Sequence, residues 1–408
     1  METVIVLGTD SPIGLAVIRD LGRHKYNVIG FGSHRYSLGL MSKYCSKGMV
    51  RNSTPELLIE QLIDVASTYH HAFLVSIGES DINLVNRHRQ RLEQYLTLLD
   101  PNAEQMAKVL DKSQTLEIAS TLAIQTPASY KIDSLEQLTA LQAQLKFPVI
   151  LKWSNPHQIA QLLQNQGLSL LKLEYCQDFN ELKDALKKYE AIARYPLIQR
   201  YCPGFGIGQF FLCREGASLV EFQHQRINEW PPEGGSSTLC QALAPDQHTS
   251  CMEQSRRLLK ALNWNGVAMV EYRYEPATNS YWLMEINGRF WGSLPLATRS
   301  DVSFASSLVE VIGKQKNPVT TTIKYGLQSR YMIPEIKRLL RILFKSELIT
   351  DPNVKFSALS ELSAFITRFF RPSIHCYVFE WNDPKPFLSD MRNAGRKILR
   401  KLLKHGSD

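Results

Sequence analysis

The chain has 408 residues, 44% of them hydrophobic, so it is long enough to bury sizeable cores and to form roughly two to four domains. Its formal net charge of +8 comes from the C-terminal part, because residues after 318 carry 16 of the 47 lysines and arginines but only 8 of the 39 acidic residues. No apolar run approaches the roughly 18 residues of a membrane span, and the N-terminus has no signal-peptide pattern, so a membrane-spanning protein is excluded.

The first hundred residues alternate between strand and helix patterns. The expected strands lie at 3–7, 27–31, 73–77 and 96–99, with a helix over 15–21 after the first of them. This order predicts a small open α/β domain over residues 1–105. The turn GTDSPIG lacks the full G-x-G-x-x-G pattern, and no acidic residue follows the second strand, so a tight structural turn is preferred to a dinucleotide site.

The segment SIGESD places three polar side chains, Glu79, Ser80 and Asp81, at the end of an expected strand. Open α/β sheets bind ligands at the carboxyl ends of their strands. Asp81 also suits the N-cap of the helix that follows, and the cap is the preferred interpretation.

Two lysines are held at defined points in residues 106–195. Lys112 begins the amphipathic helix KSQTLEIASTL, where free backbone N–H groups favour anions. Lys152 ends the apolar strand FPVILK, so its ammonium is fixed at the end of a sheet. Such a lysine is either a phosphate ligand or a surface residue whose stem packs on apolar neighbours.

GVAMVEYRYE and YWLMEIN are expected to pair as a β-hairpin within residues 196–318. The strand period puts four residues of each strand on one face: Val267, Met269, Glu271 and Arg273, and Tyr281, Leu283, Glu285 and Asn287. If the loop PATNS centres the hairpin on residue 278, Glu271 lies directly opposite Glu285.

Facing carboxylates on a ladder are destabilising unless a positive charge lies between them. Glu271, Glu285 and the amide of Asn287 are hard oxygen ligands of the kind that Mg²⁺ prefers, so they predict a magnesium site. Arg289, one step further, suits a phosphate or carboxylate. The alternative is a solvated face on which Glu271 pairs with Arg273 or Arg289.

The order of these motifs resembles the ATP-grasp superfamily from residue 1 to about 315. The motifs are Lys112, FPVILK, LIQRYCPG, Glu271 and the run Glu285 to Arg289. The resemblance implies an α/β and α+β protein with an N-terminal open α/β (pre-ATP-grasp) domain. It further implies one ATP-grasp lobe at 106–195 and a second lobe, with the metal site, at 196–318.

The resemblance also implies residue roles. Lys112 and Lys152 would contact the phosphates of ATP, and Gln199, Arg200 and Tyr201 would meet adenine between the lobes. Glu271, Glu285 and Asn287 would bind Mg²⁺. Arg289 would face the transferred phosphate, with Lys152 beside it as a second catalytic residue. Family members phosphorylate a carboxylate with ATP and let an amine or another nucleophile displace the phosphate.

Two features depart from the family pattern. The family often has a glycine-rich loop after the strand lysine, where this chain has WSNPHQIAQLLQNQG, and often has an acidic residue near the hinge, where this chain has Gln199 and Arg200. One alternative is therefore a nucleotide-binding scaffold without turnover. A Rossmann-type oxidoreductase or epimerase is disfavoured, because no Tyr-x-x-x-Lys set follows the N-terminal turn.

The segment HQRINEWPPEGGSST joins a basic side chain to a glycine loop. We expect Arg226 and the backbone amides of Gly235 and Ser236 to contact the acyl acceptor, with Arg226 counted among the catalytic residues. The alternative is a turn that needs glycine for a positive φ.

Residues 319–408 form a basic appendix with two amphipathic helical patterns. The first has Ile333, Ile336, Leu339, Leu340, Leu343 and Phe344 between Lys337, Arg338, Arg341 and Lys345; the second has Ile398, Leu399, Leu402 and Leu403 against Arg396, Lys397, Arg400, Lys401 and Lys404. Such helices either lie on an anionic membrane as a peripheral contact or pack on the body of the protein.

The cysteine pattern indicates the compartment. The seven cysteines stand singly, without metal-finger or redox spacing, which predicts a thiol-reducing compartment, the cytoplasm. No nucleic-acid reading motif is present, so nucleic acid is not an expected partner. The family resemblance implies a small carboxylate and a small amine as partners. A homodimer is left open.

Overall fold

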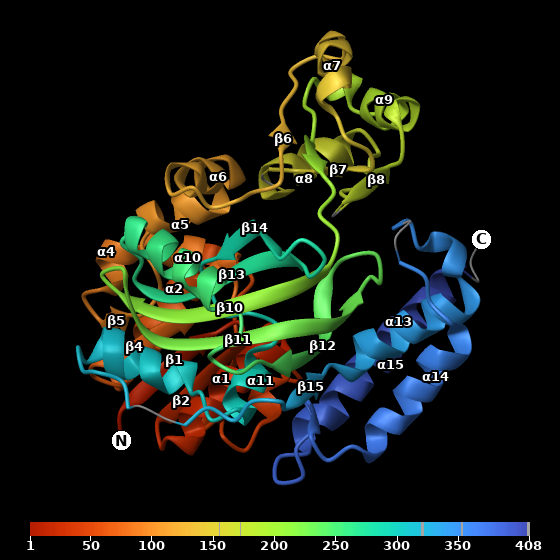
Figure 1. The fold of residues 1–408 in the computed structure, drawn as a ribbon. Helices are drawn as coiled ribbons and strands as arrows, with labels where there is room; N and C mark the ends of the chain where they lie inside the picture. The colour runs from red at the N-terminus through yellow and green to blue at the C-terminus, as the bar shows by residue number, and fades with distance from the viewer. Residues whose placement is uncertain (155, 172, 320–321, 352–353, 406–408) are drawn as a thin grey trace.

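The computed structural model describes residues 1–154, 156–171, 173–319, 322–351 and 354–405. Its strands form a five-stranded, a seven-stranded and a four-stranded sheet. Figure 1 shows the seven-stranded sheet in the middle, the N-terminal unit beneath it, the four-stranded sheet projecting above it and the C-terminal helices along one side. The α/β and α+β class expected from the sequence is confirmed.

The N-terminal unit is a parallel sheet of order β3-β2-β1-β4-β5 covered by helices. Its elements are β1 (Thr3–Leu7), α1 (Pro12–Arg23), β2 (Asn27–Gly32), β3 (Lys47–Val50), α2 (Pro55–Thr68), β4 (Ala72–Ser76), α3 (Glu79–Arg87), α4 (Arg89–Leu92) and β5 (Leu96–Leu98). Between β1 and α1, Gly8 has φ +100°, a left-handed conformation that favours glycine. The turn therefore needs Gly8 for its backbone.

The expected N-cap role of Asp81 is wrong. Gly78 is the N-cap residue of α3, and Asp81 lies in the first turn of this helix. Its buried carboxylate accepts hydrogen bonds from both terminal nitrogens of Arg51, at 3.0 and 2.7 Å. A bidentate guanidinium stabilises a buried carboxylate more than a single cap hydrogen bond would, so the side chain turns toward Arg51.

The projecting lobe is built on the four-stranded sheet β6-β9-β7-β8. Its elements, with the two helices that lead into it, are α5 (Ala103–Leu110), α6 (Lys112–Thr121), β6 (Ser129–Tyr130), α7 (Glu136–Leu141), β7 (Val149–Lys152), α8 (Pro156–Asn165), β8 (Glu174–Cys176), α9 (Phe179–Lys187) and β9 (Leu197–Arg200). Asp178 caps α9 by accepting from the backbone N–H groups of Asn180 and Glu181. Helix α8 begins at Pro156, four residues after Lys152, in a segment whose single glycine, Gly167, comes after the helix.

The central sheet has the order β14-β13-β10-β11-β12-β15-β16. Its elements, with neighbouring helices, are β10 (Phe205–Arg214), β11 (Ala217–Trp230), β12 (Ser236–Ala242), α10 (Thr249–Ala261), β13 (Gly266–Glu275), β14 (Ser280–Asn287), α11 (Leu294–Arg299) and α12 (Phe304–Leu308). Alternate residues face two cores: Phe210 and Met269 pack toward the N-terminal unit, and Phe211 and Val270 pack toward α10.

The C-terminal segment adds two strands that its sequence pattern did not indicate, β15 (Gln328–Arg330) and β16 (Ile374–Cys376), and the helices α13 (Met332–Phe344), α14 (Ala358–Thr367) and α15 (Lys385–His405). On α13, Leu339 is buried, whereas Leu340 and Phe344 are exposed. Arg341 forms an ion pair with Glu233 at 2.6 Å, so this basic residue contacts the body of the protein.

The alternative in which these helices contact a membrane is not supported by the structure or by its comparison with solved structures. In the second helical pattern, the structure describes the backbone but not the side chains of five residues: Ile398, Lys401, Leu402, Leu403 and Lys404. Within the described ranges, no helix is long and apolar enough to cross a membrane.

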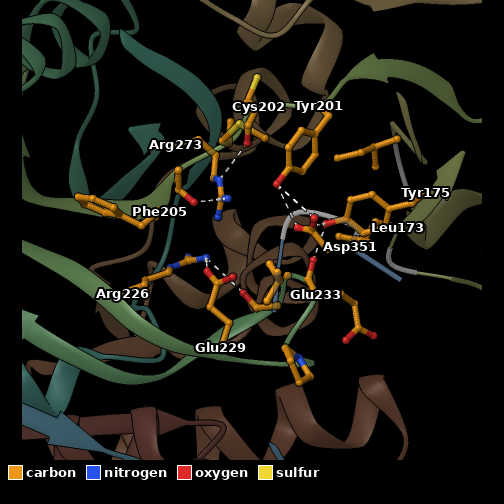
Figure 2. Close-up of a pocket in the computed structure, with 18 of the residues that line it drawn as sticks. Leu173, Tyr175, Tyr201, Cys202, Phe205, Arg226, Glu229, Glu233, Arg273 and Asp351 are labelled. Atoms are coloured by element: carbon orange, nitrogen blue, oxygen red, sulfur yellow. Dashed lines mark hydrogen bonds and ion pairs between the residues drawn. The ribbon is translucent and has the colours of Figure 1, made fainter. Parts of the chain in front are cut away.

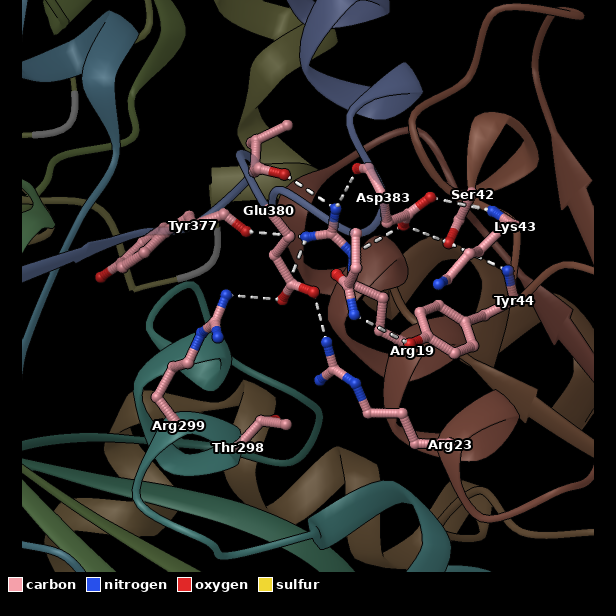
Figure 3. Close-up of polar contacts among 12 residues, drawn as sticks. Arg19, Arg23, Ser42, Lys43, Tyr44, Thr298, Arg299, Tyr377, Glu380 and Asp383 are labelled. Carbon is pink, nitrogen blue, oxygen red and sulfur yellow. Dashed lines mark hydrogen bonds and ion pairs between the residues drawn. The ribbon is translucent and has the colours of Figure 1, made fainter.

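Buried ion pairs anchor the C-terminal segment to the N-terminal unit (Figure 3). Arg19 of α1 is 2% exposed and donates from Nε to Asp383 at 2.9 Å. Asp383 also accepts from the hydroxyl of Ser42 at 2.6 Å. Glu380 binds Arg23 and, at 2.8 Å, Arg299. Charges this deeply buried are tolerated only when they are paired, so each partner depends on the other.

Candidate active site

The predicted register of the hairpin is confirmed: Glu271 on β13 lies directly opposite Glu285 on β14. The predicted faces are partly wrong. A β-bulge at Met284 shifts the register, so Tyr272 pairs with Leu283 and both side chains are buried in the core beneath α10. Leu283 therefore lies on the opposite face from Glu285. Glu285 keeps the face of Glu271 and lines the space below the projecting lobe.

Side-chain cations from outside the hairpin meet the two carboxylates. Arg226 of β11 donates to Oε2 of Glu271. Near Oε2 of Glu285, Lys112 Nζ lies at 3.5 Å and Lys152 Nζ at 4.0 Å. The alternative pairing of Glu271 with Arg273 or Arg289 is not what the structure has.

The two arginines that follow the glutamates in sequence have other partners. Arg273 donates from Nε to the carbonyl of Cys202 at 3.3 Å, which joins β13 to the segment after β9. Arg289 donates from Nε to Glu79 of α3 at 3.0 Å, which joins the hairpin to the N-terminal unit. Glu79 thus reaches the site from the strand end that the sequence singled out.

The lysine pair is an anion site by its charge. Burial and, after it, the ammonium of Lys152 lower the pKa of Lys112 to about 8, although Glu285 partly offsets both effects. One carboxylate cannot neutralise two ammonium groups. A polyanion placed here would restore the charge balance, and triphosphate is such a group.

A first cavity of about 260 Å³ lies between the projecting lobe and the central sheet (Figure 2). It has apolar walls at Ile150 and Met284, a hinge wall at Tyr201, and the charged groups Lys152 and Glu285. Ile150 and Lys152 come from β7, and Met284 and Glu285 come from β14, so both sheets contribute to one cleft.

The hinge residues divide between the cavity and the lobe. Arg200 and Tyr201 line the cavity. Gln199 is 6% exposed, and its amide donates to the hydroxyl of Ser129 at 3.0 Å, so this side chain points into the lobe. Contact of the Gln199 side chain with a nucleotide is therefore not favoured, and a backbone contact stays a prediction.

Arg226 crosses β10 at a glycine. A Cβ on Gly206 would lie 2.7 Å from Cδ of Arg226, so the glycine leaves room for the arginine to reach Glu271. Arg226 also donates to Glu229 at 3.1 Å and to the carbonyl of Gly235 at 3.2 Å. Burial opposes its charge, but Glu271 and Glu229 raise the pKa of Arg226 above its ordinary value.

The backbone of the loop at residues 234–235 requires glycine at both positions. Gly234 has φ +130°, and a Cβ on Gly235 would lie 2.0 Å from the carbonyl oxygen of Trp230. Gly235 lines the first cavity, whereas Ser236 is exposed and is not one of its lining residues. The turn interpretation is thus supported, and amide contacts to an acceptor stay a prediction.

The C-terminal segment contributes a carboxylate that the sequence did not reveal. Asp351 is 5% exposed, lines the first cavity and accepts from the hydroxyl of Tyr201 at 3.1 Å. The hydroxyl of Tyr175, on β8, lies 3.4 Å from the same carboxylate. Figure 2 shows Asp351 between these two tyrosines. Nothing in the motif ITDPNV signals a contact with residues more than a hundred positions away.

A second cavity, about 1020 Å³, begins on the other side of Glu285. Its lining residues come from α3, α5, α6 and the end of β14 and include Glu79, Lys112, Asn287 and Arg289. Glu285 lines both cavities, so the predicted metal ligand stands where they meet.

Comparison with solved structures shows what this architecture is similar to, whereas no family model and no curated protein sequence matches the chain. PurK, an N5-carboxyaminoimidazole ribonucleotide synthetase solved as an ADP complex, has a TM-score of 0.62 and 12% identity, over 84% of this chain and 85% of its own. L-amino acid ligase from Bacillus licheniformis has a TM-score of 0.57 and 13% identity, over 76% of this chain and 74% of its own. Biotin carboxylase from Campylobacter jejuni, in a β,γ-ATP complex, has a TM-score of 0.60 and 16% identity, over 80% of this chain and 74% of its own.

The chain has the ATP-grasp fold. The expected resemblance is confirmed at the level of the fold, and a cleft lies between the four-stranded and the seven-stranded sheet. Helix α8 occupies the segment after Lys152, and Tyr201, which follows β9, donates to the carboxylate of Asp351.

The donor set of the ATP-grasp cleft fits Mg²⁺. Glu271 and Glu285 face each other, and Asn287 donates its amide N–H to Oε1 of Glu285 at 3.1 Å, which leaves the amide oxygen as a ligand. Oε1 of Glu271 has no hydrogen-bond partner among the residues that the structure describes. In those same ranges, no cluster of three His, Cys, Asp or Glu side chains is placed to hold a metal, so phosphate and water oxygens would have to complete the shell.

Proposed function

We propose that the chain is an ATP- and Mg²⁺-dependent ligase that activates a carboxylate as an acyl phosphate and joins it to an amine. The observation that carries this proposal is the meeting of two cavities at Glu285, beside Lys112 and Lys152. The similar structures are a ribonucleotide synthetase, an amino acid ligase and a carboxylase, which supports an enzyme of this kind.

The first cavity suits ATP. Its apolar walls at Ile150 and Met284 would hold adenine, next to Tyr201 on the hinge, with the triphosphate directed toward the lysines. Glu271, Glu285 and Asn287 would hold Mg²⁺, which when bound supplies charge neutralisation of the β- and γ-phosphate oxygens. Lys112 and Lys152 would bind the same phosphates through their ammonium groups.

The chemistry needs no protein nucleophile. A carboxylate oxygen of the substrate attacks the γ-phosphorus of ATP, the bond to the β-phosphate oxygen breaks, and acyl phosphate and ADP form without a proton transfer. The amine nitrogen then attacks the acyl carbon. Phosphate leaves, and the nitrogen releases one proton as the amide forms.

The arginines on either side of the metal ligands would act on the reacting groups. Arg289 would neutralise charge on the transferred phosphoryl group and on the acyl phosphate. Arg226, held by Glu271 and Glu229, would position the acceptor beside the first cavity. We infer that these reactions take place in the cytoplasm on small molecules.

The test is a screen of carboxylate and amine pairs with the protein, ATP and Mg²⁺, read as ADP formation and as the mass of the condensed product. The proposal expects ADP, phosphate and amide in equal amounts. ADP formation at the same rate without any carboxylate would contradict it.

Helix α8 favours a second candidate function, a nucleotide-binding scaffold without turnover, because it stands in place of a flexible phosphate loop. Rapid mixing of excess protein with ATP separates the two proposals. A scaffold retains intact ATP over many minutes, whereas the ligase converts it when its carboxylate is present.

A further inference from the structure

Helix α14 is apolar, yet it buries nothing. All ten of its residues are described by the structure and none of them is buried, although six are apolar: Ala358, Leu359, Leu362, Ala364, Phe365 and Ile366. Short helices owe most of their stability to the packing of an apolar face. Figure 1 shows α14 at the outer edge of the C-terminal helices. The described part of the chain does not supply the packing that this composition indicates.

The inner side of α14 is identified by its contacts with the body of the protein. The ring of Phe365 lies over the guanidinium of Arg330, 4.7 Å from its centroid, and Arg330 is 2% exposed. Glu361 accepts from Arg338 of α13 at 2.7 Å. Phe365 and Glu361 therefore face inward, and the rest of the apolar residues are distributed over the other sides of the helix.

The outer side carries a regular stripe. Leu359, Leu362 and Ile366 follow each other at steps of three and four residues, and Phe369 follows after three more. This spacing is that of the seam by which one helix packs against another. With Phe370, these side chains form what we call the α14 stripe, and each keeps between 37% and 81% of its exposure. The pattern favours a helix as the occupant.

The area of the α14 stripe suits one half of a dimer interface. The exposed fractions of its five residues amount to about three whole side chains, on the order of 600 Å² at roughly 200 Å² for each large apolar side chain. The largest apolar patch on a typical monomer is about 300 to 600 Å². A stable interface buries about 800 Å² on each partner, somewhat more than half of it apolar. The stripe therefore supplies the apolar area that each side needs.

The charges around the stripe permit contact with a second copy. Glu361 is the only charged residue of α14, and it is paired with Arg338, so the helix has no free charge to repel its own copy. An acidic or a basic partner would find no complementary charge on it. Arg371 follows the stripe at one end, and an antiparallel arrangement keeps the two copies of this residue apart.

We propose that the chain forms a homodimer in which the α14 stripe packs antiparallel on the α14 stripe of a second copy. Such a contact uses the same surface on both chains, related by a two-fold axis, and so closes at two copies. None of the stripe residues lines either of the two cavities described above. The dimer is therefore independent of the proposed ligase reaction.

The test is sedimentation of the full-length protein at about 1 and about 50 µM, because interfaces of about 1,600 Å² give dissociation constants from micromolar to picomolar. The wild type should sediment with the mass of two chains at the higher concentration. Ile366→Glu places a carboxylate in the seam of each copy and should weaken the dimer by about a hundredfold or more, so that this variant sediments as a single chain.

A second variant and a control guard against loss of the fold. Leu359 is 81% exposed, so Leu359→Glu cannot disturb a core, and it should weaken the dimer in the same direction. The matched control is Leu57→Glu on α2 of the N-terminal unit, where the leucine is 52% exposed. It should sediment like the wild type. Circular dichroism should give the same helix content for all four proteins.

Three results would overturn the inference. A wild type that sediments as a single chain at about 50 µM has no dimer of the expected strength, and the stripe then serves a partner other than a second copy. A dimer that survives both Ile366→Glu and Leu359→Glu is formed by another surface. Equal dissociation of Leu57→Glu would show that the loss is not specific to α14.

Discussion

Glu271 lies directly opposite Glu285 across the β13–β14 ladder, and each carboxylate meets a cation from elsewhere in the chain. Arg226 reaches Glu271 over Gly206, and Lys112 approaches Glu285 from the start of α6. The like charges of the two glutamates are therefore balanced by groups that also line a cleft.

The affinity for ATP should fall as the pH rises from 7 to 9. The pKa of Lys112 is about 8 in the free protein, so its ammonium is mostly present at pH 7 and mostly lost at pH 9, whereas phosphates are ionised throughout this range. Calorimetry across these pH values measures the effect. Lys112→Met should bind ATP more weakly at pH 7 and lose the pH dependence; an unchanged dependence in this variant would assign it to another group.

The same substitution should stabilise the fold. Because the pKa of Lys112 is lowered from 10.5, the unfolded state binds the proton more tightly than the folded state, so the buried charge costs stability below pH 8 and the cost disappears as the pH rises through 8 to 10.5. At pH 7, Lys112→Met should raise the melting temperature by roughly a few degrees. Lys108→Met, on the exposed surface of α5, is the control and should change it little.

Removal of the Asp383 carboxylate should destabilise the protein strongly. Arg19 would then lose its 2.9 Å ion pair and keep only the longer one, 3.6 Å, with Glu380; breaking a buried pair costs up to about 3 to 5 kcal/mol. Asp184→Ala, which breaks an exposed pair with Lys187, is the control and should cost about 1 kcal/mol or less. Urea unfolding measures the free energy of unfolding of Asp383→Ala and of the control. Equal unfolding midpoints would show that the ion pair between Arg19 and Asp383 is not needed for stability.

Asp351→Asn should raise the KM for ATP by about tenfold with little change in kcat. The carboxylate accepts from Tyr201 on the hinge, and loss of a hydrogen bond to a charged group costs about 1.5 to 3 kcal/mol. Tyr201→Phe should have a smaller effect, because Asp351 also contacts the hydroxyl of Tyr175 at 3.4 Å. The double variant should cost less than the sum of the two single variants, because they share the hydrogen bond between Tyr201 and Asp351. Strictly additive effects would mean that the two residues act separately.

The sequence predicted those parts of the site that depend on local periodicity. The register of Glu271 and Glu285 followed from strand alternation and the centre of one loop, and it is correct. The bulge at Met284 was not predictable, because one extra residue leaves the apolar and polar composition of a strand unchanged. As a result, Leu283 was assigned to the wrong face.

Contacts between distant segments carried no local signal. The motif SIGESD marked Glu79 as a residue at a strand end, but its ion pair with Arg289 depends on how the N-terminal unit packs against the hairpin. Asp351 lies outside every motif of the site, and only the path of the C-terminal segment brings it to Tyr201. Strands β15 and β16 are three residues each, too short for a period to be recognised.

The most direct test of the account is ATP turnover by Glu285→Gln at limiting Mg²⁺, with the wild type and Glu275→Gln, an acid at the far end of β13, measured beside it. Glutamine keeps the shape of the side chain but removes the charge from the point where the two cavities meet. The account predicts that Glu285→Gln melts like the wild type and forms no ADP, while Glu275→Gln retains full turnover. Wild-type turnover by Glu285→Gln at limiting Mg²⁺ would contradict both the metal site and the proposed chemistry.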